Sequence, residues 1–354
     1  MIVFQKSPTT PVQPWPRRIL IVKMSSLGDL VHSLPSLGSL RALFPEAKID
    51  WVVEKPFADL LPGPPMLDNI IIFPKLEIKT LNFLKIGRIL WAFRRQLKAG
   101  DYDLCLDLQA LAKSSLVVLL SGAKKRLAYW ETREGSFFVS KGVKGPWAND
   151  HVIERYRDVI RYFGPVAEEL VYPLPDYSAQ RAELARKLAL LGSSEPRAVF
   201  FPGTRWVTKL WPWEYFAALG RELAGRGVSV VLGGEPGDQE LTQKILALAP
   251  EAHWVDLAGQ TDLRGLMALT SLANVVVGSD SGPSHLATAV GVPTISLFGP
   301  NLPSRTGVYG PLARNLASPA PCSPCFKRIC PRDFVCMSQI TVEMVLRECL
   351  LALG

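Results

Sequence analysis

Short runs of β-branched and other apolar residues, each followed by a polar loop and then a helical pattern, recur along this chain and restrict its fold more than any other feature. The first run, Arg18–Lys23, precedes the turn Met24–Asp29 and a helical pattern over Leu30–Phe44. The next run, Lys48–Val53, completes a strand–loop–helix–strand unit. Units of this kind predict a parallel sheet with helices on its faces.

The pattern restarts after about residue 180, so we expect two successive α/β domains. Strands are predicted at Ala198–Phe201, Val228–Leu232, Asn274–Val277 and Thr294–Phe298. The proline-containing segment Tyr172–Asp176 separates the two halves and is the predicted linker. Two doubly wound domains facing a central cleft would bind ligands at the carboxyl ends of their strands. The expected domains are residues 17–175 and 176–354.

Length and composition agree with this division. A chain of 354 residues suits two domains better than one, and a hydrophobic fraction of 48% is typical of ordered globular chains. No stretch approaches ~18 apolar residues without charges or turn formers, so we predict no transmembrane helix. Residues 1–16 contain four prolines and no continuous apolar core, which predicts a loose arm instead of a signal peptide. We expect a cytoplasmic protein.

Positive charge is concentrated in the N-terminal half of the chain. Residues 1–175 contain 24 Lys and Arg against 17 Asp and Glu, within a total net charge of +8. This excess suggests an anionic partner such as an acidic sugar, phospholipid head groups or nucleic acid, although a basic surface without a partner explains it equally well. The basic residues considered for contact with acidic sugar, phosphate or membrane are Lys85, Arg88, Arg94, Arg95, Lys98, Lys113, Lys124, Lys125, Arg126 and Arg133.

The loop Lys23–Asp29 leaves the first strand and opens a helix, and its small residues let backbone approach a ligand closely. Asp29 would stand near the helix N-terminus, where a carboxylate can act as a general base on a hydroxyl. The competing interpretation is that Asp29 only caps the helix. Neither G-x-G-x-x-G nor G-x-x-x-x-G-K is present, so the loop is neither a dinucleotide fingerprint nor a P-loop.

The second polar loop, Gly278–His285, also lies between a strand and a helix. Successive backbone N–H groups at such a helix start bind phosphate well. Ser281 adds a hydroxyl donor, and His285 lies one turn inside the helix. A capped helix with a packed histidine is the alternative interpretation.

The third loop follows the strand Ala198–Phe201 and is basic. Threonine, arginine and lysine there suit a diphosphate, and the Trp–Pro pair that follows is expected to pack the loop down and start the next helix. These residues are Thr204, Arg205, Lys209, Trp211 and Pro212. An ordinary basic loop is the alternative.

The fourth loop, Gly233–Asp238, ends in a carboxylate that suits the two hydroxyls of a ribose. A solvated turn explains this loop equally well. Each loop alone is a weak signal. Together they have the layout of a nucleotide-diphosphate donor site facing an acceptor site.

A cysteine cluster lies near the C-terminus, within a segment rich in Pro and Arg. Four of the six cysteines have the spacing C-x2-C-x4-C-x5-C, namely Cys322, Cys325, Cys330 and Cys336. A zinc site with four thiolates is one interpretation, because the cytosol keeps thiols reduced. We favour a structural loop with free thiols or an opportunistic disulfide, since the chemistry outlined above needs no such site.

Taken in order, the motifs closely resemble the ADP-heptose:lipopolysaccharide heptosyltransferases, glycosyltransferase family 9. The matching segments are Ile21–Asp29, His32, Pro35, Asp50–Glu54, Lys209–Pro212 and Asp280–His285. Their order and spacing agree over about residues 17–345 and are most similar to heptosyltransferase I. Two departures leave the acceptor open: the cysteine-rich loop is more similar to heptosyltransferase II, and Arg205 stands where type I enzymes have a small hydroxyl residue.

The resemblance implies two Rossmann-like domains in the GT-B arrangement, an inverting mechanism, an ADP-heptose donor, and no metal or other cofactor. Residues 17–175 would bind the acceptor, and residues 176–354, with the cysteine-rich loop 321–337 and a terminal helix, would bind the nucleotide sugar. Asp29 is the implied base. Donor contacts are assigned to Ser25, Ser26, Gly28, Thr204, Arg205, Lys209, Asp238, Asp280, Ser281, Gly282 and His285, and acceptor contacts to Lys113, Lys124, Arg126 and Arg133.

The implied function is transfer of L-glycero-D-manno-heptose to the lipopolysaccharide inner core, onto Kdo-lipid A or the first heptose, with peripheral contact to the inner leaflet and no nucleic-acid partner. A related transferase with another nucleotide sugar or acceptor and a non-catalytic nucleotide-binding module are the alternatives. A hydrolase is disfavoured: Gly278-x-Asp280-x-Gly282 superficially resembles a nucleophile elbow, but its histidine should lie well downstream, and His285 follows Asp280 by five residues.

Overall fold

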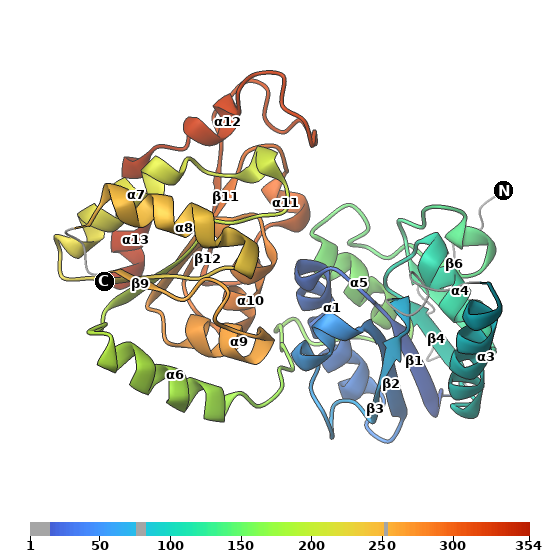
Figure 1. Cartoon of the computed structure of the whole chain (residues 1–354). Coiled ribbons are helices and arrows are strands. Elements are labelled where there is room, and N and C mark those ends of the chain that lie inside the picture. Colours follow the sequence, from blue (N-terminus) through green and yellow to red (C-terminus); the bar gives the residue numbers. More distant parts are fainter. Residues whose placement is uncertain (1–14, 76–82, 251–253) are drawn as a thin grey trace. The chain divides into compact units, whose positions relative to one another are not determined.

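The computed structural model describes residues 15–75, 83–250 and 254–354. The chain separates into two compact units, Met1–Pro175 and Asp176–Gly354 (Figure 1). Each unit contains a six-stranded sheet with helices around it, and every strand pair within the two sheets is parallel. The predicted α/β class and doubly wound sheets are therefore confirmed. Most of the predicted N-terminal arm, residues 1–14, lies outside the described residues.

The sheet of the first unit has the strand order β3-β2-β1-β4-β5-β6. Its strands are β1 (Arg18–Val22), β2 (Lys48–Glu54), β3 (Asn69–Phe73), β4 (Leu104–Asp107), β5 (Lys125–Tyr129) and β6 (Lys141–Val143). Its helices are α1 (Leu27–Leu43), η1 (Lys55–Leu60), α3 (Phe83–Ala99), α4 (Ala112–Ser121), η2 (Ser136–Phe138) and α5 (Val152–Arg161). Helix α3 carries five of the basic residues considered above, namely Lys85, Arg88, Arg94, Arg95 and Lys98.

Strand β1 lies in the middle of this sheet and is buried on both faces. Its four apolar residues, Ile19–Val22, are at most 1% exposed, and the strand pairs with β2 on one side and β4 on the other. A strand buried on both faces needs a continuous apolar run, which is the pattern found in the sequence. The predicted strand–loop–helix–strand unit is confirmed as β1, α1 and β2.

The second unit repeats this architecture with the strand order β12-β11-β10-β7-β8-β9. Its strands are β7 (Arg197–Phe201), β8 (Ser229–Leu232), β9 (Trp254–Asp256), β10 (Val275–Ser279), β11 (Thr294–Phe298) and β12 (Ala313–Ala317). Its helices are α6 (Ser178–Leu190), η3 (Val207–Lys209), α7 (Trp213–Ala224), η4 (Pro236–Asp238), α8 (Gln239–Leu248), α9 (Leu263–Ser271), α10 (Gly282–Val290), α11 (Pro303–Thr306), α12 (Val335–Ser338) and α13 (Val342–Leu353).

Trp211 ties the loop after β7 to the end of the chain. Its ring is 2% exposed, and its Nε1 donates a 2.8 Å hydrogen bond to the carbonyl oxygen of Ile340. Pro212 caps α7, which begins at Trp213. The expected packing of this loop by the Trp–Pro pair is confirmed. Within the described ranges, no helix is long and apolar enough to cross a membrane.

Gly220→Ala is expected to destabilise the second unit, although alanine is the better helix former. A Cβ at Gly220 would lie 2.0 Å from Cη2 of Trp254, whose ring is held by a 2.8 Å hydrogen bond from Nε1 to the Ala249 carbonyl. Overpacking of this kind costs ~1–3 kcal/mol, more than the ~1 kcal/mol that alanine gains in helix propensity. The urea unfolding midpoint, followed by circular dichroism, should fall.

Gly87→Ala in α3 is the matched control, because no described atom lies within 4 Å of a Cβ added there. This variant should keep or raise the free energy of unfolding by up to ~1 kcal/mol. Equal stabilisation by both substitutions would contradict the packing described for Gly220.

Candidate active site

The carboxyl edge of each sheet, where its strands end, carries the polar residues of interest. In the first unit, β1, β2 and β4 end at Val22, Glu54 and Asp107 and run in the same direction. The loops after these strands therefore meet at one edge. The predicted loop Lys23–Asp29 is one of them.

Asp29 lies in the first turn of α1, and both of its carboxylate oxygens have neighbours. Oδ2 accepts hydrogen bonds from the backbone N of Ser26 at 3.2 Å and from Ser26 Oγ at 2.8 Å. Oδ1 lies 3.9 Å from Nζ of Lys23, and 46% of the Asp29 side chain is exposed. The capping interpretation is thus partly correct, because the carboxylate holds the Ser26 N–H. Nearly half of the side chain nevertheless remains accessible to a substrate.

Lys23 places a buried ammonium beneath Asp29. Its side chain is 3% exposed, and Nζ donates to the Tyr156 hydroxyl at 2.8 Å and to the Leu108 carbonyl at 3.0 Å. Burial, and then the Asp29 charge, raise the pKa of Tyr156 well above its usual range. Tyr156 therefore remains a neutral phenol that fixes the position of the ammonium.

The loop after β4 braces the backbone next to Asp29. The Gln109 side-chain oxygen accepts hydrogen bonds from the N–H groups of Met24 at 3.0 Å and Ser25 at 3.3 Å. Asp107 holds this loop by accepting from the N–H groups of Gln109 and Ala110. Burial raises the pKa of Asp107 to about 6 against these hydrogen bonds. Ser25 thus sits in a rigid frame.

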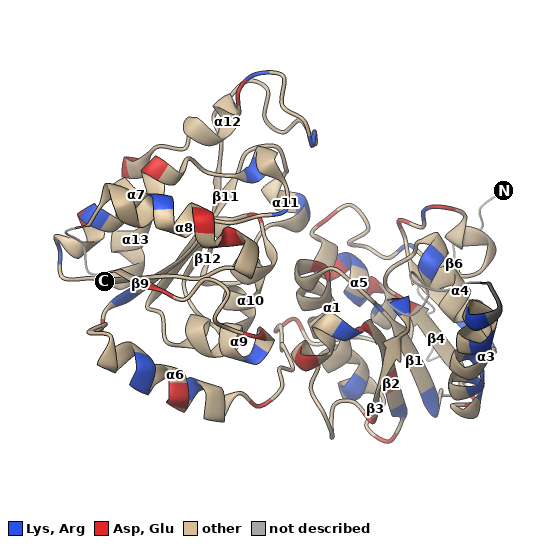
Figure 2. Ribbon diagram, viewed as in Figure 1, with Lys and Arg blue, Asp and Glu red and all other residues tan. Residues whose placement is uncertain are grey.

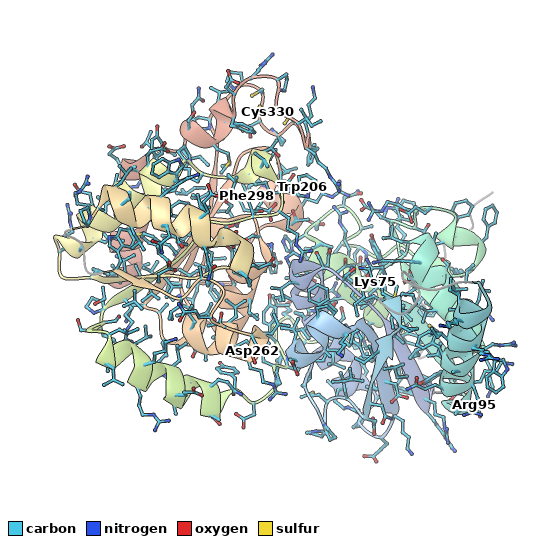
Figure 3. All side chains as sticks on the ribbon, viewed as in Figure 1. Lys75, Arg95, Trp206, Asp262, Phe298 and Cys330 are labelled. Carbon is cyan, nitrogen blue, oxygen red and sulfur yellow. The ribbon has the colours of Figure 1, made fainter. Side chains whose placement is uncertain are left out.

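Two lysines surround one buried carboxylate close to Ser25. Lys75 Nζ lies 2.5 Å from Glu54 Oε2, and Lys113 Nζ lies 3.2 Å from Oε1 and donates to Ser25 Oγ at 2.8 Å. Burial raises the pKa of Glu54, but the Lys75 and Lys113 interactions outweigh it and lower the pKa. Lys75 is labelled in Figure 3. These three side chains, two partly exposed ammonium groups and one carboxylate, together carry one net positive charge.

The four residues assigned to acceptor contacts divide between opposite edges of the sheet. Lys113 lies at the carboxyl edge, and Arg133 follows β5 there, with its N–H bonded to the Ala110 carbonyl at 3.0 Å. Lys124 precedes β5 and pairs with Asp103 at 3.1 Å, while Arg126 Nε donates to the Ala123 carbonyl. Parallel strands start at the edge opposite to Asp29, so the structure does not bring Lys124 or Arg126 to it. The assignment of these two residues to acceptor contacts stays a prediction.

A cavity of about 570 Å³ also lies at this amino-terminal edge. It is lined by Trp15, Arg17, Phe44 and Lys48, among other residues. Ligands of parallel α/β sheets bind outside the carboxyl ends of the strands. We therefore locate the site by the polar groups around Asp29 and not by this cavity.

In the second unit, Asp280 is the centre of a polar cluster at the end of β10. Lys209 Nζ lies 2.7 Å from Oδ2, Asn301 Nδ2 donates to Oδ2 at 2.6 Å, and His285 Nε2 lies 3.3 Å from Oδ1. Burial raises the pKa of Asp280, but the hydrogen bond with His285 and the Lys209 charge outweigh it and lower the pKa to about 2. Asp280 is thus an ionised carboxylate that orients Lys209 and His285.

The N-terminus of α10 adjoins this cluster. Ser281 is its N-cap, Gly282 is its first residue, and Pro283 lacks an N–H. The buried hydroxyl oxygen of Ser281 has no hydrogen-bond partner among the residues that the structure describes. Buried polar atoms are nearly always paired with protein, water or ligand, so this hydroxyl suits a bound group. Helix N-termini favour anions there.

The loop after β7 meets the cysteine-rich loop. Lys209 Nζ lies 4.8 Å from the centre of the Trp206 ring, and the Arg328 guanidinium lies 4.6 Å from the same centre. Thr208 Oγ1 donates to the Lys327 carbonyl at 3.0 Å. Figure 3 labels Trp206 and Cys330. The cysteine-rich loop therefore braces the segment that carries Lys209.

Asp238 joins the loops after β7 and β8. Its Oδ2 accepts from the Glu235 N–H at 2.8 Å, and a Cβ on Gly203 would lie 2.1 Å from its Oδ1. Burial raises the pKa of Asp238. Thr204 is half-buried beside this contact, whereas Arg205 is exposed and 3.6 Å from Glu235, an ion pair of little energetic weight.

The cysteine-rich loop contains free thiols. All six cysteines of the chain are unpaired, and Cys336 is buried while Cys322, Cys325 and Cys330 are half-buried. In residues 15–75, 83–250 and 254–354, no group of three or more His, Cys, Asp or Glu has an arrangement that could hold a metal ion. The four-thiolate zinc arrangement considered from the spacing is absent from this part of the chain.

Sequence reasoning missed several residues of both clusters. Glu54 is the last residue of a buried strand, and Gln109 and Asn301 follow buried strands. A search for polar residues at strand ends could therefore have found all three. Tyr156 lies in the middle of α5 and Trp206 in a loop, and neither has a local signal. Only their tertiary contacts with Lys23 and Lys209 reveal them.

Asp280→Asn is expected to lower the free energy of unfolding of the second unit in a pH-dependent manner. A folded-state pKa of about 2 against an ordinary 3.8 stabilises the fold above pH 4 by about 2 kcal/mol. Because the folded pKa is depressed, this contribution is lost as pH falls towards 2, by about half at pH 3. Urea unfolding at pH 6 and pH 3 should show the gap between wild type and variant shrinking.

Asp238→Asn is the control with the opposite sign. Its folded pKa is raised, so its contribution is present below the ordinary pKa and is lost as pH rises through the folded value. The stability of this variant relative to wild type should therefore improve between pH 3 and pH 6. The same pH trend in both variants would contradict the Asp280 network.

Comparison with known proteins adds to this geometry. The sequence matches Glycosyltransferase family 9 (heptosyltransferase) over residues 90–335. It is 35% identical to Lipopolysaccharide heptosyltransferase 1 of Pseudomonas aeruginosa, covering 88% of this chain and 87% of that protein. It is 27% identical to Lipopolysaccharide heptosyltransferase 2 of Escherichia coli, covering 82% of this chain and 84% of that protein.

A solved structure agrees with these relatives. The structure of Escherichia coli heptosyltransferase WaaC with ADP has a TM-score of 0.75 and 27% identity, covering 95% of this chain and 99% of that one. Sequence and fold are therefore similar along nearly the whole chain. The chain belongs to glycosyltransferase family 9, the heptosyltransferases, and is a glycosyltransferase of GT-B fold.

Proposed function

We propose that the protein transfers L-glycero-D-manno-heptose from ADP-heptose to the lipopolysaccharide inner core, with Kdo-lipid A or the first heptose as acceptor. The observation that carries this proposal is a half-exposed Asp29 held beside a buried ammonium at the carboxyl edge of its sheet. Relatives named as lipopolysaccharide heptosyltransferases and a neighbour solved with ADP-2-deoxy-2-fluoro heptose support the substrates. The first unit takes the acceptor, and the second takes the nucleotide sugar.

In this mechanism Asp29 is the general base. It removes the proton from an acceptor hydroxyl, and that oxygen attacks the anomeric carbon from the face opposite to ADP. The bond from the anomeric carbon to the diphosphate breaks, which inverts the configuration. The Ser26 hydrogen bonds fix Oδ2 of Asp29, and a general base gains efficiency from such fixed geometry.

The second unit stabilises the leaving diphosphate. Lys209, oriented by Asp280, supplies a positive charge, and Thr204, Ser281 and the N–H of Gly282 supply hydrogen bonds. Losing one such preorganised partner typically costs about 3 kcal/mol of transition-state stabilisation. Asp238 accepts hydrogen bonds from the ribose hydroxyls in this scheme.

The acceptor is acidic, and the net positive charge around Ser25 suits it. Lys75 and Lys113 share a single carboxylate, Glu54, so together they attract an anionic sugar to the edge that carries Asp29. Arg133 adds a third cation at that edge. In this proposal the enzyme is cytoplasmic. It meets its lipid-linked acceptor at the inner leaflet, in peripheral contact with the membrane.

Incubation with ADP-heptose and heptose-deficient lipopolysaccharide tests the proposal. The acceptor mass should increase by one heptose, and UDP-linked sugars should be poor donors. Transfer from a UDP-linked sugar instead would favour a related transferase. Tight ADP-heptose binding without transfer to any glycolipid would favour a non-catalytic module.

Asp29→Asn should abolish transfer while retaining the donor. The amide oxygen can still accept the Ser26 hydrogen bonds, so the helix start is preserved while the basicity is lost. We expect kcat to fall about 10²–10⁴-fold with the ADP-heptose Kd unchanged, measured by steady-state kinetics and calorimetry. Wild-type kcat in this variant would refute the assignment of the base.

Lys23→Met tests the buried ammonium as a positioning group for Asp29. Without this positive charge the ionised Asp29 carboxylate is less favoured, so the acidic limb of the kcat/KM profile should move to higher pH. Lys23→Arg should restore the wild-type limb at least in part. A uniform loss of rate at every pH would mean that Lys23 is only structural.

A further inference from the structure

Helix α3 carries an unusual concentration of positive charge. Its 17 residues include Lys85, Arg88, Arg94, Arg95 and Lys98 and no Asp or Glu. Figure 2 shows blue and no red along this helix. Charges of one sign on a helix repel one another, so such a surface is unfavourable without an anionic counterpart.

The basic residues are arranged around an aromatic side chain. Arg88, Trp91, Arg95 and Lys98 follow one another at spacings of three, four and three residues, so they share one side of the helix. We call this side the basic–aromatic face. At ~1.5 Å rise per residue it is about 15 Å long.

The opposite side of α3 anchors the helix to the first unit. Phe93 and Leu97 are 4% and 0% exposed and pack in a cluster that includes Val117 and Val118 of α4. They lie about half a turn away from Trp91 and Arg95 on the helix. The basic–aromatic face therefore points away from the core, and Arg95, labelled in Figure 3, points away from the sheet.

Trp91 exposes its ring to solvent between the basic side chains of this face. It is 62% exposed, and the Arg95 guanidinium lies 5.1 Å from its ring centre. Tryptophan is enriched at membrane–water interfaces, where its ring enters the head-group region, and basic side chains around it bind anionic lipids. Within the described ranges, Arg88, Arg95 and Lys98 have no carboxylate within ion-pair distance.

We propose that the basic–aromatic face of α3 binds the anionic surface of a lipid bilayer, with Trp91 inserted among the head groups and the three cations on lipid phosphates. The inference rests on the proposed function in one respect only: a lipid-linked acceptor gives this protein a reason to bind a membrane. A bilayer fits the face better than nucleic acid does, because the ring lies at the centre of a short, straight stripe and not in a groove.

Flotation of the full chain with phosphatidylcholine vesicles, with and without phosphatidylglycerol, tests the proposal. The wild type should float with the anionic vesicles and be released by added salt. Arg88→Glu with Arg95→Glu should weaken binding at least about tenfold, since each cation near an anionic surface contributes substantially. Trp91→Ala should weaken binding with every charge retained.

Two matched controls separate the face from general charge and general exposure. Arg181→Glu with Arg186→Glu changes two exposed arginines of α6, a helix that also contains Glu183, by the same total charge. Phe138→Ala removes an aromatic ring that is 84% exposed and lies in η2, outside α3. Both controls should float like the wild type.

The proposal is overturned if either control loses as much binding as the α3 variants, or if the α3 variants float like the wild type. Loss of duplex DNA binding with vesicle binding retained would overturn it in favour of nucleic acid. Transfer to a soluble, deacylated acceptor is measured in parallel and should be unchanged in the α3 variants. If no variant or wild type transfers heptose, the proposed function fails while the vesicle result stands on its own.

Discussion

Parallel hydrogen bonding between neighbouring strands is the constraint on which both polar clusters depend. Because β1 and β4 run side by side in one direction, their ends meet, and the Met24 N–H reaches the Gln109 side chain 85 residues away. The same pairing of β7 with β10 brings Lys209 to Asp280 across 71 residues. Each cluster is thus a product of strand order, with no single continuous segment responsible.

The two units use a lysine–carboxylate pair in different ways. The Lys209–Asp280 pair is short and buried, and Asn301 and His285 complete it, so Asp280 stays ionised and does not take up protons near neutral pH. The Lys23–Asp29 pair is longer, and Asp29 is nearly half exposed. The two carboxylates therefore differ in burial. Asp280 is buried and orients its neighbours, whereas Asp29 is accessible to a reacting hydroxyl.

Much of the fold was predictable because its signals are local. Apolar runs of four to six residues marked the central strands, and the Trp–Pro pair before α7 marked a helix start. The short edge strands β6 (Lys141–Val143) and β9 (Trp254–Asp256) were not predicted, since three residues carry no periodicity and the pairing comes from a neighbouring strand. Likewise, Tyr156 has no motif around it and is identified only by its contact with Lys23.

The sequence by itself determined the α/β class, the division into two halves and the polar loops at strand ends, because hydrophobic periodicity and turn residues are properties of neighbouring positions. Only the tertiary structure decided which basic residues share an edge with Asp29: Lys113 does, and Lys124 and Arg126 do not. It also decided that Asp280 is saturated by donors while Asp29 is accessible. These outcomes depend on strand order and burial, which are set by contacts between residues far apart in the chain.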